Sequence, residues 1–451
     1  MNNLKGRFSN TTTMSIPSDG EIRKILVDRI DVRRQSVGIV VGVIEYNEKR
    51  VIPYGHLEVG DPRSLNGDTV FEIGSITKVF TKLLLADMTQ RGEVFLDDPV
   101  GKYLPSTVRM PERNGHAITL IDLATHTSGL PREPANMSYT DTGNPYADYT
   151  IEQLYEFLSN YSLTRDIDSE REYSNLGFGL LGHALARRAD IDYESLVYSR
   201  ICAPLGMNNT RITFTQDMKK LFAAGHDPGL TFVENWDFPA LPGFGALRST
   251  VNDLLIFLSV HLDPTDTSLE PAITYAQEKV PRPAGREGME VNLGWGKSKI
   301  NGKQICWHSG GTGGYCSWAG FDPGAHTGVV VLSNTGWLVD DIGFHLLDTN
   351  SPLAKPPSEH TEIKIDIGLY DLYIGTYKVG PDFALTVSRE GEHLFSKATG
   401  MAKYEIFPES EQDFFYKVMD AQITFVTGDD GYATELILHI DRSTDHLKRV
   451  E

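Results

Sequence analysis

Three kinds of feature are scarce in this chain of 451 residues, and each scarcity excludes a class of protein. Only three cysteines occur, Cys202, Cys306 and Cys316, so we expect neither a disulfide framework nor a cysteine-based zinc site. The histidines form no H-x-x-x-H pair, and no Walker loop or dinucleotide glycine motif is present. No apolar run approaches the length of a membrane span. The sequence therefore predicts no metal, no cofactor and no membrane-spanning segment.

Basic residues are also in the minority. The chain has 42 lysines and arginines against 61 aspartates and glutamates, which gives a net charge of −19. This charge disfavours nucleic acids and anionic membrane surfaces as partners. The polar start MNNLKGRFSNTTTMSIPSDG lacks the continuous apolar stretch of a secretion signal. We expect a cytoplasmic protein, or a secreted or periplasmic one if a signal segment has been removed.

The most informative feature that is present is a serine three residues before a lysine, Ser75 and Lys78, in the stretch FEIGSITKVFTKLLL. The apolar residues that follow have helical spacing, and Gly92 is expected to end the helix. Residues three apart share a helix face, so the Lys78 amine is expected to reach the Ser75 hydroxyl. The helix N-terminus also favours negative charge on an attacked carbonyl. By itself, however, the pair is better explained as a capping serine beside a solvated lysine.

A second pair of candidates, Tyr173 and Asn175, lies in the segment EREYSNLGFG just before a predicted buried helix. A phenol beside a serine and a lysine can pass a proton to a leaving group. A neighbouring amide can hold the lysine or the substrate by hydrogen bonds. By themselves these residues are better explained as a packed tyrosine and a helix-capping asparagine.

An acylating serine also needs backbone N–H donors for an oxyanion, and two H-x-G segments are candidates to supply them. The first is His308-Ser309-Gly310, followed by Gly311 and further glycines; the second begins at His326. A glycine-dense segment lets a substrate approach the backbone closely, whereas His326 opens an apolar strand after turn residues. We therefore choose the first segment and interpret His326 as structural.

The order of predicted elements indicates two domains, as expected for a chain of this length. A helix at 21–34 and a hairpin from residue 36 begin the first domain, and helices and long loops dominate residues 71–212. Strand patterns return at three apolar segments, 303–308, 315–323 and 326–334, followed by a helix near 339–347. The sheet is thus expected to be completed by residues far from its first strands.

The segment SPLAKPPSEHT, residues 351–361, is rich in proline and polar residues and is predicted to link the domains. After it come short alternating strands at the close spacing of an antiparallel sandwich or barrel. We predict a polar N-terminal extension (1–20), a first domain (21–350), the linker and an all-β domain (362–451). The last is expected to pack, to cover the active site or to form a homo-oligomer.

These motifs together, S-x-x-K, Y-x-N and H-x-G in this order, carry a resemblance to a known family. With the surrounding segments TVFEIGSITKVFT, ITLIDLATHTSGLP and GVVVLSN, the region from about 20 to 350 resembles the β-lactamase and penicillin-binding-protein-like serine hydrolases. It is most similar to the group of class C β-lactamases, D-aminopeptidases, DD-carboxypeptidases and related esterases. The tail resembles a lipocalin-like β-barrel. The implied α/β (α+β) fold is a β-lactamase-like antiparallel sheet flanked by helices, with an inserted helical region and a C-terminal antiparallel β-barrel.

The resemblance also implies roles for the candidate residues. Ser75 would be the nucleophile, Lys78 the base and Tyr173 the group that passes a proton to the leaving group. Asn175, His308, Ser309 and Gly310 would bind substrate or shape the oxyanion site, and the N–H groups of Ser75 and Gly311 would be the oxyanion donors. Lys78 must then be partly neutral, so its pKa has to fall well below the usual value of about 10.4.

One departure from the family bears on the substrate. Many β-lactamases and DD-peptidases have a lysine where His308 stands, and a mostly neutral histidine weakens this anchor for a substrate carboxylate. We therefore expect a serine hydrolase of small carboxylic esters or of amides of D-amino acid peptides. The alternatives are a β-lactamase or DD-carboxypeptidase, an acyltransferase, and a non-catalytic penicillin-binding sensor.

Overall fold

The computed structural model describes residues 16–46, 48–137, 143–265, 267–278, 280–283, 290–356, 360–379, 383–399, 403–440 and 443–450. Residues 1–15 of the predicted N-terminal extension, Asn47 in the predicted hairpin turn and residues 357–359 in the predicted linker lie outside these ranges. Within the described ranges, no helix is both long and apolar enough to cross a membrane.

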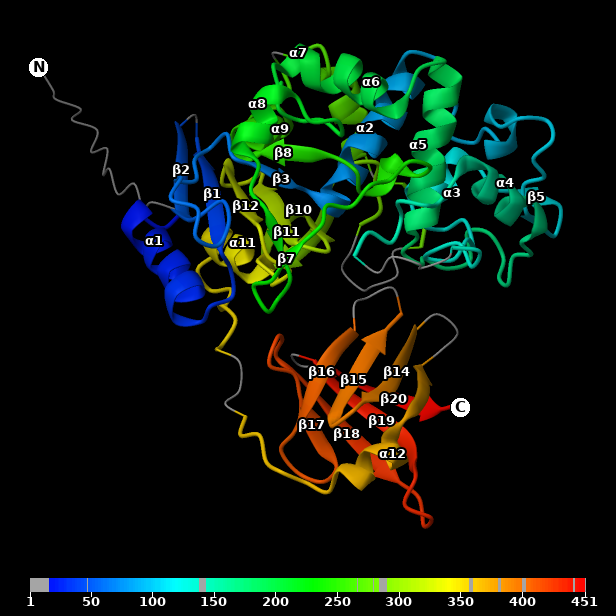
Figure 1. Ribbon diagram of the computed structural model, residues 1–451. Helices are drawn as coiled ribbons and strands as arrows, with labels where there is room; N and C mark the ends of the chain where they lie inside the picture. The colour runs from blue at the N-terminus through cyan, green and yellow to red at the C-terminus, as the bar shows by residue number, and fades with distance from the viewer. Residues whose placement is uncertain are drawn as a thin grey trace, which may run out of the picture.

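A six-stranded antiparallel sheet forms the centre of the first domain, in the order β2-β1-β12-β11-β10-β9 (Figure 1). Its strands are β1 (Gly38–Glu45), β2 (Glu48–Gly55), β9 (Gly296–Ile300), β10 (Lys303–Thr312), β11 (Tyr315–Asp322) and β12 (Thr327–Ser333). Strand β1 pairs with β12, almost 300 residues later, as the apolar segments predicted. The predicted antiparallel sheet completed by distant residues is confirmed.

Both faces of this sheet are covered by helices, which explains why its middle strands are continuously apolar. Successive side chains of a strand point to opposite faces. In β1, Ile39, Val41 and Val43 face a core with α1 (Asp19–Val27) and α11 (Asp340–Leu347). The alternate residues, Val40 and Ile44, face the larger core that contains α2 (Thr77–Gln90) and α9 (Val251–Leu262).

The helix predicted at 21–34 is α1 followed by a π-helical turn, Asp28–Val32. The long region between β3 (Val70–Glu72) and β8 (Arg248–Thr250) is an insertion on the second face of the sheet. Because β3 and β8 pair with each other, the chain leaves and returns at the same place. The inserted region is mostly helices and loops, as predicted, and extends further than the predicted 71–212.

The remaining helices and short strands of the first domain lie mainly in this insertion. The helices are α3 (Leu120–Ala124), α4 (Ile151–Asn160), α5 (Asn175–Ala189), α6 (Tyr193–Val197), α7 (Ala203–Leu205), α8 (Gln216–Leu221) and, after β8, α10 (Glu270–Gln277). The strands are β4 (Glu112–Arg113), β5 (His116–Ala117), β6 (Gly225–His226) and β7 (Phe232–Val233). In the predicted segment 118–131 only α3 is helical.

The C-terminal part is a closed antiparallel β-barrel, which confirms the predicted all-β fold (Figure 1). After the short helix α12 (Tyr370–Tyr373), its strands are β13 (Gly375–Val379), β14 (Phe383–Glu390), β15 (His393–Ala398), β16 (Lys403–Pro408), β17 (Asp413–Phe415), β18 (Ala421–Thr427), β19 (Ala433–Ile440) and β20 (Ser443–Arg449). Its interior is packed with aromatic and aliphatic side chains, among them Tyr373 stacked on Phe425.

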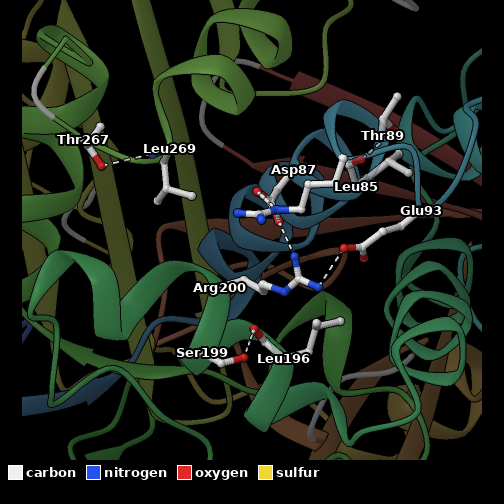
Figure 2. Close-up of polar contacts among 10 residues, drawn as sticks. Leu85, Asp87, Thr89, Glu93, Leu196, Ser199, Arg200, Thr267 and Leu269 are labelled. Carbon is white, nitrogen blue, oxygen red and sulfur yellow. Dashed lines mark hydrogen bonds and ion pairs between the residues drawn. The ribbon is translucent and has the colours of Figure 1, made fainter.

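Helix α2 is buried along most of its length and is fixed at its C-terminal end by ion pairs (Figure 2). The buried Asp87 binds Arg91 at 2.8 Å and Arg200 at 3.3 Å, and Arg200 also binds Glu93 at 2.9 Å. Arg200 lies on the π-helical turn Tyr198–Cys202 that follows α6. The network therefore joins the end of α2 to a distant part of the insertion.

We expect Arg200→Ala to lower the free energy of unfolding by about 1 to 3 kcal/mol, because the buried Asp87 loses a charged partner. Lys220→Ala is the control, because Lys220 pairs with Asp217 at the surface, where their side chains are 73% and 84% exposed. This control should change stability by less than about 0.5 kcal/mol. Urea denaturation of the two variants measures the difference, and equal losses would contradict the assigned role of Arg200.

Candidate active site

Ser75 lies in a short 3-10 turn, Gly74–Ile76, that leads directly into α2. The turn is packed tightly against strand β10. A Cβ atom on Gly310 would lie 2.1 Å from the Ile73 carbonyl oxygen and 2.8 Å from the Ser75 nitrogen. A Cβ on Gly74, whose φ is +48°, would lie 2.7 Å from the backbone nitrogen of Gly311. Only glycines allow this approach, which places β10 beside the Ser75 N–H.

Two predicted side chains meet the Ser75 hydroxyl. The Lys78 amine donates to Ser75 Oγ at 2.8 Å, and the Tyr173 hydroxyl donates to the same oxygen at 3.0 Å. The Lys78 amine also donates to the Phe244 carbonyl oxygen at 2.9 Å. This carbonyl comes from the far end of the insertion, just before β8. Lysine, tyrosine and serine thus form one connected hydrogen-bonded group.

Burial changes the acidity of this group. The Lys78 side chain is buried, and this lowers its pKa, although Tyr173 and Glu133 act in the opposite direction. Burial alone would raise the pKa of Tyr173, but the Lys78 charge and the hydrogen bonds that Tyr173 shares with Lys78 and Ser75 lower it below the usual value. The two shifts favour sharing of one proton between the amine and the phenol, which therefore titrate together.

Tyr173 is held in place by the loop before α5 and by the segment around His126. Its ring stacks on His126 at 4.5 Å between centroids, and the Arg132 guanidinium lies 5.3 Å from the ring centre. The ring nitrogen His126 Nδ1 accepts a hydrogen bond from the backbone N–H of Ser174 at 3.0 Å. Ser174 is the residue that caps α5, because its hydroxyl accepts from the Gly177 N–H.

Asn175 is the first residue of α5 and does not cap it. Its side-chain amide donates to Glu133 Oε1 at 2.6 Å. Sequence reasoning did not select Glu133, because it lies in a loop without periodicity after the segment HTSGLPR. The only local signal was a pair of neighbouring charged residues, Arg132 and Glu133, between two prolines.

The H-x-G segment divides between the two faces of β10. His308 is in electrostatic range of Lys78, and burial lowers its pKa to about 3, with the Lys78 charge acting in the same direction. It is therefore neutral at physiological pH. Ser309 points the other way, because its hydroxyl bonds to Asp340 at the start of α11. The structure thus brings His308, Gly310 and Gly311 to the Ser75 side, but not the Ser309 side chain. His326, at φ +54°, precedes β12 in a turn.

A second lysine, the half-buried Lys82, lies one helical turn after Lys78. The Lys82 amine donates to the carbonyl oxygens of Asn292 and Gly294, both at 3.2 Å. Burial lowers the pKa of Lys82 to about 7, and the charges of Arg171 and Lys78 add to this effect. Among the residues that the structure describes, no group of three or more histidine, cysteine, aspartate or glutamate side chains could hold a metal ion. The three cysteines are free and buried.

The residues of this site lie within a region that matches a known family. A family model described as Beta-lactamase matches residues 23–340, which include the Ser75 turn, the Tyr173 loop and β10. The chain belongs to the Beta-lactamase family. Members of this family and the related penicillin-binding proteins are serine hydrolases. A second model, described as Domain of unknown function (DUF3471), matches residues 362–449, the barrel.

Individual relatives agree with this assignment. This chain is 34% identical over 229 residues to D-alanyl-D-alanine-carboxypeptidase/endopeptidase AmpH of Escherichia coli (strain K12). The match covers 50% of this chain and 58% of AmpH. The chain is 25% identical to Penicillin-binding protein 4* of Bacillus subtilis (strain 168), over 88% of this chain and 91% of that protein. A crystal structure of a Beta-lactamase/D-alanine carboxypeptidase from Yersinia pestis superposes with a TM-score of 0.62 and 26% identity, covering 74% of this chain and 98% of that one.

The tight contact between β10 and the Ser75 turn indicates that a larger residue at Gly310 should lower activity. Gly310→Ala should reduce hydrolase activity by roughly 100-fold or more, because the added methyl group pushes β10 away from the Ser75 turn. Gly20→Ala is the control, because a Cβ at Gly20, in α1, meets no atom within 4 Å. Hydrolysis of p-nitrophenyl acetate measures both variants. Full activity of the Gly310 variant would show that the close approach is not needed.

Proposed function

We propose that this protein is a serine hydrolase that forms an acyl-enzyme on Ser75 and transfers the acyl group to water. Its substrates are small carboxylic esters or amides of D-amino acid peptides. The observation that carries the proposal is the convergence of the Lys78 amine and the Tyr173 hydroxyl on Ser75 Oγ, at 2.8 and 3.0 Å. A serine with a general base in hydrogen-bond reach is the arrangement that nucleophilic catalysis needs.

The proposed reaction has two halves. Ser75 Oγ attacks the substrate carbonyl, and the Lys78–Tyr173 pair takes the hydroxyl proton. The backbone N–H groups of Ser75 and Gly311 stabilise the oxyanion of the tetrahedral intermediate. When the bond to the leaving amine or alcohol breaks, Tyr173 returns the proton to it. Water then attacks the acyl-enzyme in the same way, which releases the acid and restores Ser75.

The environment of Lys78 supports its proposed role as base. A lysine can accept a proton only in its neutral form, and burial favours that form. The neighbouring phenol, with its lowered pKa, provides a second site for the same proton. Which of the two groups carries the proton changes during the reaction, so we assign the role of base to the pair.

The choice of substrate is supported by His308. Because its pKa is about 3, this residue offers no permanent positive charge for a substrate carboxylate. Efficient hydrolysis of β-lactams, which have such a carboxylate, is therefore disfavoured. A β-lactamase or DD-carboxypeptidase activity is the second candidate, because relatives of those names match the chain.

The nucleophile is tested by Ser75→Ala, which should abolish turnover of every substrate because no acyl-enzyme can form. The substrates to compare are p-nitrophenyl acetate, a D-alanyl p-nitroanilide and a chromogenic cephalosporin. We expect the ester and the D-alanyl substrate to be cleaved faster than the cephalosporin. Mass spectrometry of the rapidly quenched enzyme should show an acyl adduct on Ser75 that is absent from the variant. Full activity of Ser75→Ala would contradict the assignment.

The base is tested by Lys78→Arg, because a guanidinium keeps its proton at any accessible pH. We expect a loss of roughly 100- to 10,000-fold in kcat/KM. In the wild-type enzyme kcat/KM should rise with pH as the amine loses its proton. This rise should lie below the usual lysine pKa, since burial shifts the pKa of Lys78 downward.

The control for this variant is Lys102→Arg, a half-exposed lysine paired with Asp98. It should keep wild-type activity and the same pH profile. Thermal unfolding confirms that each variant is folded. A Lys78→Arg enzyme with an unchanged pH profile would exclude Lys78 as the group whose deprotonation activates Ser75.

A further inference from the structure

His126 is a buried histidine beside Tyr173 to which the proposed mechanism gives no role. It lies two residues after α3 and is 4% exposed. Its imidazole contacts two aromatic rings, with centroid distances of 4.5 Å to Tyr173 and 4.7 Å to Phe178. The Tyr173 hydroxyl donates to Ser75 Oγ, so a displacement of the Tyr173 ring would move this hydroxyl away from the serine.

Two polar contacts of His126 hold the backbone on either side of Tyr173. The His126 carbonyl oxygen accepts a hydrogen bond from the Glu172 N–H at 2.9 Å. The ring nitrogen Nδ1 accepts one from the Ser174 N–H at 3.0 Å. The same ring stacks on the side chain of the residue between them. One histidine therefore contacts three consecutive residues, with Tyr173 in the middle.

The backbone of His126 has an uncommon conformation. Its φ is +63°, in the left-handed region that residues with a Cβ atom rarely adopt. Such a conformation costs free energy and persists only where the surrounding structure imposes it, often at functional sites. In this conformation both the carbonyl oxygen and the ring of His126 reach the segment before α5.

The ring must be neutral to make these contacts. A neutral imidazole has one N–H and one lone pair. Because the Ser174 N–H is a donor, Nδ1 holds the lone pair and Nε2 carries the proton. Burial keeps the pKa of His126 well below its usual range, and the charges of Arg171 and Lys82 act in the same direction. The acceptor is therefore retained at physiological pH.

We propose that His126 is a positioning residue for Tyr173, which it holds at the distance from Ser75 Oγ that proton transfer requires. This inference rests on the proposed function, in which Tyr173 returns a proton to the leaving group. His126 acts through Tyr173 and not on the substrate. Its loss should therefore impair reactions that need this proton more than reactions that do not.

The test compares two acetate esters that differ only in the leaving group. Ethyl acetate releases ethanol, whose oxygen needs a proton, whereas p-nitrophenyl acetate releases p-nitrophenolate, a stable anion. Both give the same acetyl-enzyme, and kcat/KM reports the acylation step. In His126→Ala, kcat/KM for ethyl acetate should fall roughly 10- to 100-fold, the range expected for a displaced catalytic group. The loss for p-nitrophenyl acetate should be several-fold smaller.

His126→Asn is the second variant, because asparagine tolerates a left-handed φ and its Oδ1 atom can accept from the Ser174 N–H. It should lose less activity than His126→Ala, and it allows the same comparison if the alanine variant does not fold. The control is His183→Ala. His183 lies on α5 and bonds through Nε2 to the Tyr155 hydroxyl at 2.7 Å. This control should leave the ratio of the two rates unchanged.

Equal losses for the two esters in the His126 variants would overturn the proposal, because His126 would then act only through the fold. Wild-type rates in both variants would overturn it as well. So would a wild-type enzyme that cleaves p-nitrophenyl acetate but not ethyl acetate, since Tyr173 would then supply no proton. Failure of the proposed function is distinct, because neither ester would then show Ser75-dependent turnover.

Discussion

Burial of the Lys78 amine is the constraint on which the rest of the site depends. An amine in water would stay protonated and could not accept the Ser75 proton. In this protein the amine is surrounded by the Phe244 carbonyl, Ser75 Oγ and the ring of Tyr173, whose centre is 4.8 Å away. Removing a charged group from water disfavours its charged form. The large core around α2 therefore has a chemical consequence as well as a structural one.

That burial requires elements from distant parts of the chain to meet. The turn before α2 brings Ser75, α2 itself brings Lys78, and the loop before α5 brings Tyr173. The segment before β8 supplies the Phe244 carbonyl. The insertion between β3 and β8 holds these elements together because its two ends pair. The ion pairs of Arg200 fix the far end of α2, so the helix is supported both near Ser75 and at its opposite end.

The glycines of β10 provide the space that the close approach of this strand to the Ser75 turn requires. The Ser75 turn and β10 approach so closely that a side chain on Gly310 would collide with the Ile73 carbonyl. Backbone N–H groups from the two segments can then point to one place, as an oxyanion requires. The same strand places His308 in the site as a neutral group. His308 therefore offers no permanent positive charge at this position.

Much of the fold could be predicted because local patterns determine it. The apolar runs at 36–46 and 326–334 predicted β1 and β12, since a strand covered on both faces must be apolar throughout. The barrel followed from the short alternating strands after the linker. Helix boundaries were less accurate: the helix predicted at 21–34 changes to a π-helical turn at Asp28.

By itself, the sequence determined the order of the three motifs and, with the helical spacing of Ser75 and Lys78, one short-range contact of the site. Only the tertiary structure decided the rest, because those contacts join residues that no local pattern connects. The Phe244 carbonyl lies 166 positions from Lys78, and Glu133 lies 42 positions from Asn175. The motif likewise could not show where the Ser309 side chain points. The alternation of β10 turns its hydroxyl toward Asp340 and away from Ser75. Burial, which sets the acidity of Lys78 and His308, is likewise a property of the assembled core.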